Sequence, residues 1–146
     1  MSRLVFDLES NGLLHQLDRI HCIAVTDIEN RDRRKDSTRI YDGQQGIKEA
    51  IAVLSEADEI IGHNIIAFDI PAIQKVYPEW QPKGKVTDTL VLSRLVFADL
   101  MSDDATSVSL PDEFKKRLWG SHSLKAWGLR MGTMKGDYEG GWDECN

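Results

Sequence analysis

Leu4-Val5-Phe6-Asp7-Leu8-Glu9-Ser10-Asn11-Gly12 is the segment from which the architecture of this chain can be worked out. Its apolar, β-favouring start and the turn-forming group Ser10-Asn11-Gly12 at its end predict a short strand. Asp7 and Glu9 are two residues apart, and residues at that spacing in a strand point to the same face of a sheet. Two carboxylates on one face repel each other unless a cation lies between them. The strand therefore ends either in a metal site or in a solvated acidic end.

Two further strands are expected close behind this one. Residues 20–28 (IHCIAVTDI) form a nearly continuous apolar run, which is typical of a central strand. Residues 38–42 (TRIYD) form another run after the charged segment 30–36, which we interpret as a solvated hairpin tip. Three strands with short links favour an antiparallel meander.

The pattern then changes to helices that alternate with short strands. Ile47, Ala50, Ile51 and Leu54 follow the i, i+3, i+4, i+7 spacing of an amphipathic helix over residues 46–57. The later elements expected are strands at 59–62 and 85–87 and helices at 68–76, 89–100, 112–118 and 123–131, the last capped by Ser123. Residues 101–111 are expected to form a polar loop, and residues 132–146 an irregular tail.

This order of elements predicts the α/β class. Three antiparallel strands followed by β-α-β-α units give a mixed sheet covered by helices. The length of 146 residues fits a single domain over residues 1–146. In such sheets ligands bind at the carboxyl ends of strands, so the residues that follow strands are the first candidates for a site.

Composition disfavours several classes of protein. The formal net charge is −6 at pH 7, which disfavours coating of duplex DNA by charge alone but not an acidic enzyme that meets phosphates through metal ions. No run approaches the roughly 18 apolar residues of a membrane span, and the N-terminus is not a secretory signal. Two cysteines, Cys22 in an apolar run and Cys145 near the end, are too few for a disulfide framework. We therefore expect a cytoplasmic protein, with Cys22 in the core and Cys145 exposed.

A second group of candidates lies in the segment Gly62-His63-Asn64-Ile65-Ile66-Ala67-Phe68-Asp69, which follows a strand and opens a helix. Asp69 is either a cap of that helix or a partner of Asp7 at the end of a neighbouring strand. Asn64 is a turn residue that could also bond a ligand or a carboxylate. Asp88 precedes another helix after a short strand, and capping is its expected role.

Together these residues resemble a known family. Phe6-Asp7-Leu8-Glu9 and Asn64-x3-Phe68-Asp69 look like the Exo I (D-x-E) and Exo II (N-x3-[FY]-D) motifs of DnaQ-like, DEDD-type 3′–5′ exonucleases. Residues 86–95 (VTDTLVLSRL), 119–130 (WGSHSLKAWGLR) and 134–138 (MKGDY) are similar to the proofreading domain of T-seven-like phage DNA polymerases of family A. The resemblance extends from Arg3 to about Tyr138.

The resemblance implies an RNase H-like fold and removal of nucleotides from the 3′ end of single-stranded DNA. It also implies two divalent ions, Mg²⁺ or Mn²⁺, that activate a water and stabilise the leaving oxygen. Asp7, Glu9 and Asp69 match three of the four metal-binding carboxylates of the family. Asp7 is then the ligand that bridges both ions.

Substrate contacts are implied for residues that flank the motifs. Leu13, Leu14 and Phe68 could wedge or stack a frayed terminal base, and plain core packing is the alternative for all three. His63 and His122 are expected to be hydrogen-bonded structural residues.

The chain departs from the family pattern near its C-terminal end. The fourth carboxylate of the family lies in Exo III, a Y-x3-D or H-x4-D motif on a late helix. Tyr138 is followed four residues later by Trp142, and Asp143 is one place late. We therefore expect a C-terminally truncated form of the fold that lacks the fourth ligand.

Three explanations of this departure remain open. The chain is a piece of a split or truncated phage polymerase whose partner or downstream fragment supplies Exo III. Alternatively, it is a degenerate module that binds nucleic acid or a polymerase partner without cleavage, or Asp143 or Glu144 substitutes for the missing ligand. The first predicts a 3′–5′ exodeoxyribonuclease in the host cytoplasm that is weak or inactive as the isolated chain. RNA remains a possible substrate, because no motif reveals a contact to the 2′-OH.

Overall fold

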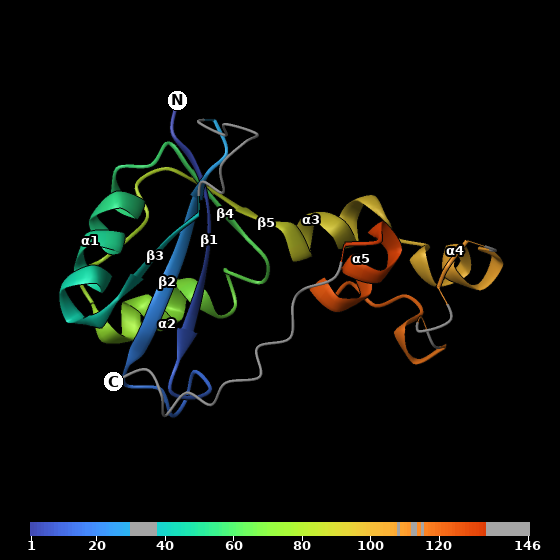
Figure 1. Ribbon diagram of the computed structural model, residues 1–146, viewed down its shortest axis with the longest axis horizontal. Helices are drawn as coiled ribbons and strands as arrows, with labels where there is room; N and C mark the ends of the chain where they lie inside the picture. Colours follow the sequence, from blue (N-terminus) through green and yellow to red (C-terminus); the bar gives the residue numbers. More distant parts are fainter. Residues whose placement is uncertain (30–37, 108, 112–113, 115, 134–146) are drawn as a thin grey trace. The chain divides into compact units, whose positions relative to one another are not determined.

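A computed structural model defines the fold (Figure 1) and describes residues 1–29, 38–107, 109–111, 114 and 116–133. The chain divides into two compact units, Met1–Leu92 and Ser93–Asn146. The single domain expected over residues 1–146 stays a prediction.

A five-stranded mixed sheet in the order β3-β2-β1-β4-β5 forms the centre of the first unit (Figure 1). β1 (Arg3–Ser10) pairs antiparallel with β2 (Ile20–Asp27), which pairs antiparallel with β3 (Thr38–Asp42). On its other side β1 pairs parallel with β4 (Glu59–Gly62), which pairs parallel with β5 (Lys85–Asp88). The predicted meander and mixed sheet are confirmed.

The central strand β1 has one buried and one open face. Leu4, Phe6 and Leu8 are buried, whereas Val5 and Asp7 are exposed, as the two-residue period of a strand requires. The parallel ladder between β1 and β4 ends at the pair Val5 and Ile61. The carboxyl end of β1 therefore extends beyond its pairing with β4.

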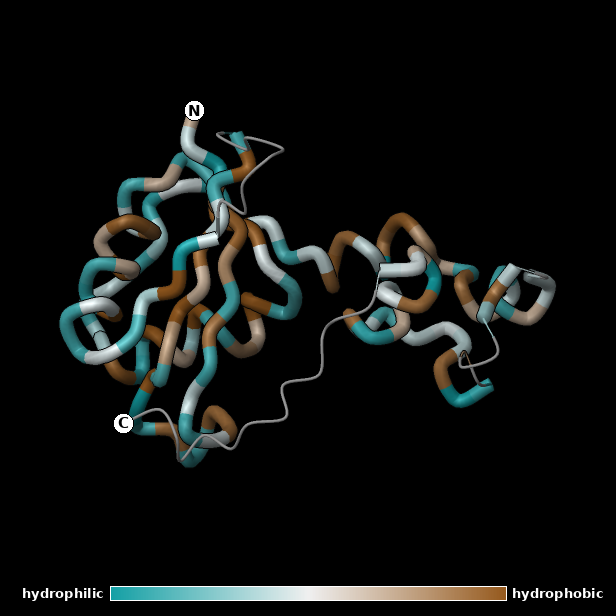
Figure 2. The backbone as a smooth tube through the Cα atoms, viewed as in Figure 1, coloured by the Kyte–Doolittle hydropathy of each residue, from teal (hydrophilic) through white to brown (hydrophobic). Residues whose placement is uncertain are grey.

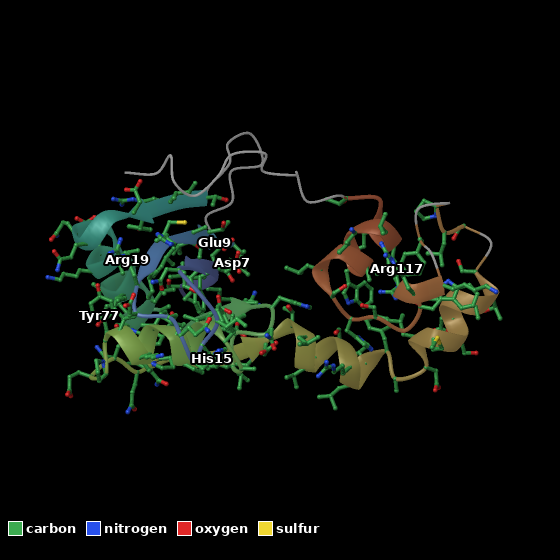
Figure 3. The ribbon with its side chains drawn as sticks, turned by 90° about the horizontal axis from the view of Figure 1, so that it is seen from below. Asp7, Glu9, His15, Arg19, Tyr77 and Arg117 are labelled. Carbon is green, nitrogen blue, oxygen red and sulfur yellow. The ribbon has the colours of Figure 1, made fainter. Side chains whose placement is uncertain are left out.

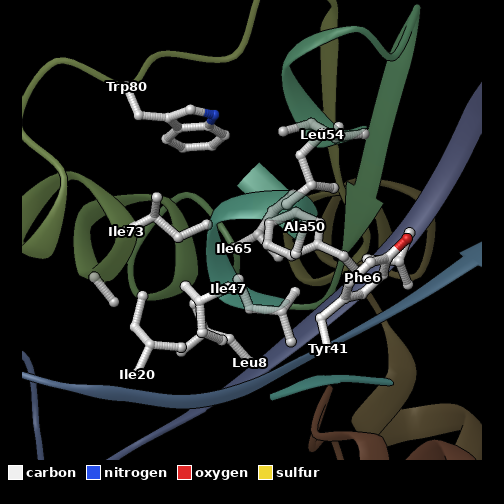
Figure 4. Close-up of a cluster of buried hydrophobic side chains, with 14 of the residues drawn as sticks. Phe6, Leu8, Ile20, Tyr41, Ile47, Ala50, Leu54, Ile65, Ile73 and Trp80 are labelled. Carbon is white, nitrogen blue, oxygen red and sulfur yellow. The ribbon is translucent and has the colours of Figure 1, made fainter. Parts of the chain in front are cut away.

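Two helices cover the buried face of the sheet. α1 (Gly43–Ser55) contributes Ile47, Ala50 and Leu54, as its spacing predicts, and α2 (Asp69–Val76) contributes Ala72 and Ile73. These side chains form one core with those of β1, part of which is drawn in Figure 4. The core therefore holds the start of α2 close to the sheet.

α3 (Thr89–Val96) begins directly after β5 and carries apolar residues that the cores do not use. Val91, Leu92, Leu95 and Val96 are between 45% and 75% exposed, and most of the helix is brown in Figure 2. The helix predicted over 89–100 is correct up to Val96 only. α4 (Leu100–Thr106) then forms where a polar loop was expected over 101–111, so that prediction is wrong over this range.

The second unit also contains a 3₁₀ turn, η1 (Lys116–Leu118), and α5 (Leu124–Met131). The hydroxyl oxygen of Ser123 accepts a hydrogen bond from the backbone N–H of Ala126 at 3.3 Å, which confirms the predicted cap. The helix expected over 112–118 lies partly outside the described residues. Where it is described, it is the short turn η1.

A buried ion pair joins α4 to α5 within this unit. The Arg130 guanidinium donates to both carboxylate oxygens of Asp104, at 2.9 and 2.6 Å, and to the carbonyl oxygen of Ser121 at 2.8 Å. It also lies over the rings of Phe114 and Trp127, at 4.9 and 5.1 Å. The bonds from Arg130 lower the pKa of Asp104 against the opposing effect of burial, so the pair stays ionised.

Candidate metal-binding site

Asp7 and Glu9 lie beside each other on the same face of β1 (Figure 3). This face is opposite to the one that bears Phe6 and Leu8. Asp7 is exposed and Glu9 is half-buried. The arrangement is the one that their spacing in the sequence predicts, and both carboxylates are accessible to a ligand.

Asp69 is the first residue of α2, and its carboxylate reaches β1. The carboxylate oxygen Oδ1 accepts a hydrogen bond from the backbone N–H of Leu8 at 3.2 Å, and the residue is 4% exposed. The N-cap of α2 is Phe68, so the interpretation of Asp69 as an N-cap is wrong. The carboxylate of Asp69 therefore contacts the distant strand β1 and does not cap the start of its own helix.

The pKa of Asp69 is raised by burial and by neighbouring acids. Burial raises its pKa to about 6, and the negative charge of Asp7 adds to that effect against the opposing hydrogen bond from Leu8. A weaker contribution in the same direction comes from Asp88. The negative charge of Asp7 thus disfavours the ionised form of Asp69.

The described residues do not by themselves form a complete metal site. Among them, no three acidic, histidine or cysteine side chains converge as a group that could hold a metal ion. Asp143 and Glu144, the alternative fourth ligands, lie outside the described residues, as do Tyr138 and Trp142. The donors that are described nevertheless fit a hard divalent ion, because they are carboxylates that repel each other without one.

Asp88 holds the loop that leads from β4 to α2. Its carboxylate oxygen Oδ1 accepts from the backbone N–H of Asn64 at 2.9 Å, and Oδ2 accepts from that of Ile66 at 3.0 Å. Oδ1 also accepts from the N–H groups of Leu90 and Val91 at the start of α3, at 2.9 and 3.4 Å. Burial opposes ionisation, but these four bonds outweigh it and lower the pKa of Asp88. The sequence predicted the bonds to α3 and not those to the loop.

The same loop begins with a glycine that allows close contact with β1. A Cβ atom at Gly62 would lie 2.8 Å from the carbonyl oxygen of Phe6 and would overlap the side chain of Ile65. Two residues later, Asn64 has a φ of 69°, a left-handed conformation that asparagine tolerates better than most residues. Local sequence thus lets the loop lie against the central strand.

The predicted substrate-contacting residues differ in exposure. Leu13 is 65% exposed, whereas Leu14 and Phe68 are partly buried and pack against the core. The ammonium group of Lys75 on α2 donates to the carbonyl oxygens of Leu14 and His15, at 2.9 and 3.1 Å. Lys75 thus fixes the loop after β1, and no pattern in the sequence could have shown that long-range contact.

The two predicted structural histidines lie next to hydroxyl groups, and Cys22 lies at the margin of the core. His63 Nδ1 lies 3.0 Å from the hydroxyl of Thr89, and His122 Nδ1 lies 3.0 Å from that of Ser93, so both histidines are hydrogen-bonded as predicted. Cys22 is half-buried rather than fully inside the core. Among the described helices none is both long and apolar enough to cross a membrane.

The amino-acid sequence is similar to those of two phage DNA polymerases. The chain is 35% identical over 145 residues to a DNA-directed DNA polymerase of Enterobacteria phage T3 and 33% identical to that of Escherichia phage T7. Each alignment covers 93% of this chain and 20% of the relative, so the chain spans about a fifth of the length of these curated relatives.

Structures of exonuclease I are among the solved structures with a similar fold. A product-bound structure of exonuclease I matches with a TM-score of 0.61 at 15% identity, over 93% of this chain and 39% of the other. Exonuclease I of E. coli in complex with an oligonucleotide matches with a TM-score of 0.59 at 18% identity, over 91% of this chain and 36% of the other. A family model described as the RNase H superfamily matches residues 4–125. Because that match covers most of the chain, this protein belongs to the RNase H superfamily.

Proposed function

We propose that this chain is the 3′–5′ exonuclease module of a phage-type DNA polymerase and removes nucleotides from the 3′ end of single-stranded DNA. The observation that carries the proposal is the approach of Asp69 to the strand that bears Asp7, through its bond to Leu8. The similarity to two phage polymerases and the fold shared with exonuclease I support it.

In this proposal Asp7, Glu9 and Asp69 hold one or two divalent ions, Mg²⁺ or Mn²⁺. Carboxylate oxygens are the ligands that such ions prefer, and the repulsion between Asp7 and Asp69 would be relieved by a cation. Bound ions would lower the pKa of a water and stabilise the developing charge on the leaving 3′ oxygen. The chain itself carries a formal charge of −6, so the ions also supply the positive charge that phosphates require.

The substrate contacts follow from the exposure of the flanking residues. Leu13 offers an exposed apolar side chain close to the end of β1, where it can wedge against a terminal base. Leu14 and Phe68 present only part of their surface, and Asn64 lies in the loop of the second motif. In this proposal the base is held at the loop after β1, and the phosphate meets the ions that Asp7 would bind.

A complete site takes a fourth carboxylate, either from Asp143 or Glu144 or from a polymerase partner or fragment. The relatives are polymerases about five times as long as the matched segment, which favours a source within a polymerase, in the same chain or in another. The proposed setting is then the host cytoplasm.

Binding of Mn²⁺ tests the site, because it does not depend on the activity of the isolated chain. We expect the wild-type chain to bind Mn²⁺ in an electron paramagnetic resonance titration, and Asp7→Asn and Asp69→Asn to weaken that binding at least tenfold. Asp103→Asn, which changes an exposed acid on α4, serves as the matched control. Equal binding by all four proteins would overturn the metal assignment.

Trimming of a 5′-labelled single-stranded DNA with Mg²⁺ or Mn²⁺ then tests the reaction. We expect shortening from the 3′ end that is lost in Asp7→Asn and rises when a polymerase partner supplies the fourth ligand. Binding of DNA without trimming, both with and without the polymerase partner, would support the alternative, a module that holds nucleic acid and does not cleave it. Preference for an RNA oligonucleotide over the DNA would correct the substrate.

A further inference from the structure

Asp88 ends the edge strand β5 and receives hydrogen bonds from two separate segments. Its side chain accepts from Asn64 and Ile66 in the loop before α2, and from Leu90 and Val91 at the start of α3. A helix cap needs only the second pair. The first pair makes the carboxylate a bridge between the end of β5 and the loop of the second motif.

We infer that Asp88 is a positioning residue, which fixes the loop between β4 and α2 and thereby sets where Asp69 lies against β1. The inference rests on the proposed function, in which Asp69 is a metal ligand. It assigns Asp88 no contact with an ion or with the substrate.

The loop transmits the position of its anchor to α2 through its own backbone bonds. The carbonyl oxygen of Asn64 accepts from the N–H groups of Ala67 and Phe68, at 3.2 and 3.0 Å. The carbonyl oxygen of Ile65 accepts from the N–H of Ile70, at 2.9 Å. Asn64 and Ile65 are therefore bonded to the residues on either side of Asp69, so we expect a shift at Asn64 to be passed on to Asp69.

The other end of this segment is fixed by the bond between Asp69 and Leu8 at 3.2 Å. The loop is thus held at two points, by Asp88 at its start and by β1 at its end. A second contact supports the first point, because the Thr89 hydroxyl donates to the carbonyl oxygen of Gly62 at 3.1 Å. The junction of β5 and α3 therefore bonds the loop on both sides of Asn64, at Gly62 and at Ile66.

The two oxygens of Asp88 have different tasks, which makes substitution by asparagine informative. Oδ1 serves Asn64 and α3, and Oδ2 serves Ile66. An amide has one acceptor oxygen, so in Asp88→Asn one of these N–H groups must face an NH₂ donor. Keeping the acceptor oxygen at the Oδ1 position retains the bonds from Asn64 and α3 but costs the bond from Ile66, so the loop loses one of its two bonds to Asp88.

Glu59 offers a matched control, because it is a buried carboxylate of β4 that pairs with a residue of β5. It is a buried carboxylate at the start of β4, and it pairs with Arg3 at 2.7 Å and with Lys85 at 3.0 Å. The strand β4 separates it from the loop, which leaves from the other end of that strand. Glu59→Gln should reduce stability without moving Asp69.

The first measurement needs no metal. In Asp88→Asn we expect the backbone amide resonance of Leu8 to shift in an NMR spectrum, because its acceptor Asp69 is displaced although Asp88 takes no part in that bond. Glu59→Gln should leave the Leu8 resonance in place at an equal loss of stability in urea. An unmoved Leu8 resonance in a folded Asp88→Asn protein, with the Ile66 resonance shifted, would overturn the inference.

The second measurement uses Mn²⁺ alone as the probe. We expect Asp88→Asn to weaken Mn²⁺ binding by about 10- to 100-fold, as loss of a residue that orients a ligand does, and Glu59→Gln to leave it unchanged. Wild-type affinity in Asp88→Asn would contradict the positioning role. Where the wild-type chain itself binds no Mn²⁺, the proposed function fails, and the Leu8 resonance still decides the role of Asp88.

Asp88→Glu covers the case in which Asp88→Asn does not fold. It keeps both acceptor oxygens and the charge but lengthens the side chain by one methylene group. We expect a folded protein with a smaller shift at Leu8 and an intermediate loss of Mn²⁺ affinity. A shifted amide resonance of Ile66 with both of these values unchanged would overturn the inference, because the loop would then have moved without moving Asp69.

Discussion

The carboxylate of Asp69 accepts a hydrogen bond from the backbone N–H of Leu8, 61 residues earlier in the chain. The ladder between β1 and β4 ends at Val5 and Ile61, so this bond continues the contact where strand pairing stops. It joins the second acidic motif to the strand that carries the first. Several measurable properties depend on it.

Asp7→Asn should lower the pKa of Asp69. The charge of Asp7 raises that pKa, but burial is the larger cause, so the value should fall from about 6 and remain above 3.8. A pH titration of the carboxyl carbon of Asp69 by NMR, without divalent ions, measures this. An unchanged value would mean that the two carboxylates do not interact, and Asp103→Asn controls for the change in net charge.

Asp69→Asn should stabilise the metal-free protein at high pH. The folded pKa of Asp69, about 6, lies above its ordinary value of 3.8, so its contribution to stability is full below pH 3.8 and is lost as pH rises through 6. The neutral amide avoids that loss and still offers an oxygen to Leu8. We expect a gain on the order of 1 to 2 kcal/mol at pH 8, after discounting for solvent, and none at pH 3.5. Urea unfolding at the two pH values measures it, and an equal effect at both would refute the electrostatic cause.

Gly62→Ala should destabilise the first unit by about 1 to 3 kcal/mol, as overpacking does. Its Cβ would lie 2.8 Å from the carbonyl oxygen of Phe6, which belongs to the central strand and cannot yield easily. Gly12→Ala is the control, because its Cβ would meet nothing closer than 3.6 Å. Thermal unfolding of both variants checks this, and equal midpoints would show that β4 lies farther from β1.

Arg130→Met should destabilise the second unit by about 3 to 5 kcal/mol, because it leaves the buried carboxylate of Asp104 without its partner. Lys83→Met removes an exposed pair with Glu56 and should cost less than about 1 kcal/mol. Tryptophan fluorescence during urea unfolding reports the change, since Trp127 contacts Arg130. A double variant, Asp104→Leu with Arg130→Met, should recover part of the loss.

Glu59→Gln should make the free energy of unfolding depend less on pH at low pH. Bonds from Thr87, Arg3 and Lys85 lower the pKa of Glu59 from 4.5 to about 2. Its contribution is therefore present above pH 4.5 and is lost as pH falls toward 2. Urea unfolding between pH 2 and pH 5 should show a shallower slope for the variant, and an identical slope would indicate that Glu59 is not paired in solution.

Local sequence was sufficient to predict the mixed sheet, its antiparallel start and the shared face of Asp7 and Glu9. The alternation at Leu4, Phe6 and Leu8 places Asp7 and Glu9 on the open face without knowledge of any distant residue. The spacing of Ile47, Ala50 and Leu54 likewise predicts the buried side of α1. These features depend on periodicity within one element, which a sequence displays directly.

Contacts between distant residues could not be predicted in the same way. Asp104 falls in a polar stretch that looks like a loop. It is buried in a helix because it pairs with Arg130, 26 residues later. Asp69 looks like a helix cap until its bond with Leu8 is seen. Asp88 has a cap's position and a cap's bonds, so nothing local reveals its second pair of donors.

The bond from Leu8 to a side chain also separates two kinds of motion in one strand. The backbone N–H groups that β1 gives to β2 exchange with deuterated water only when the sheet opens. The N–H of Leu8 is instead released whenever the Asp69 carboxyl turns away. Deuterium uptake at this single backbone position therefore counts the departures of one acidic side chain, while its neighbours in the strand record the opening of the sheet.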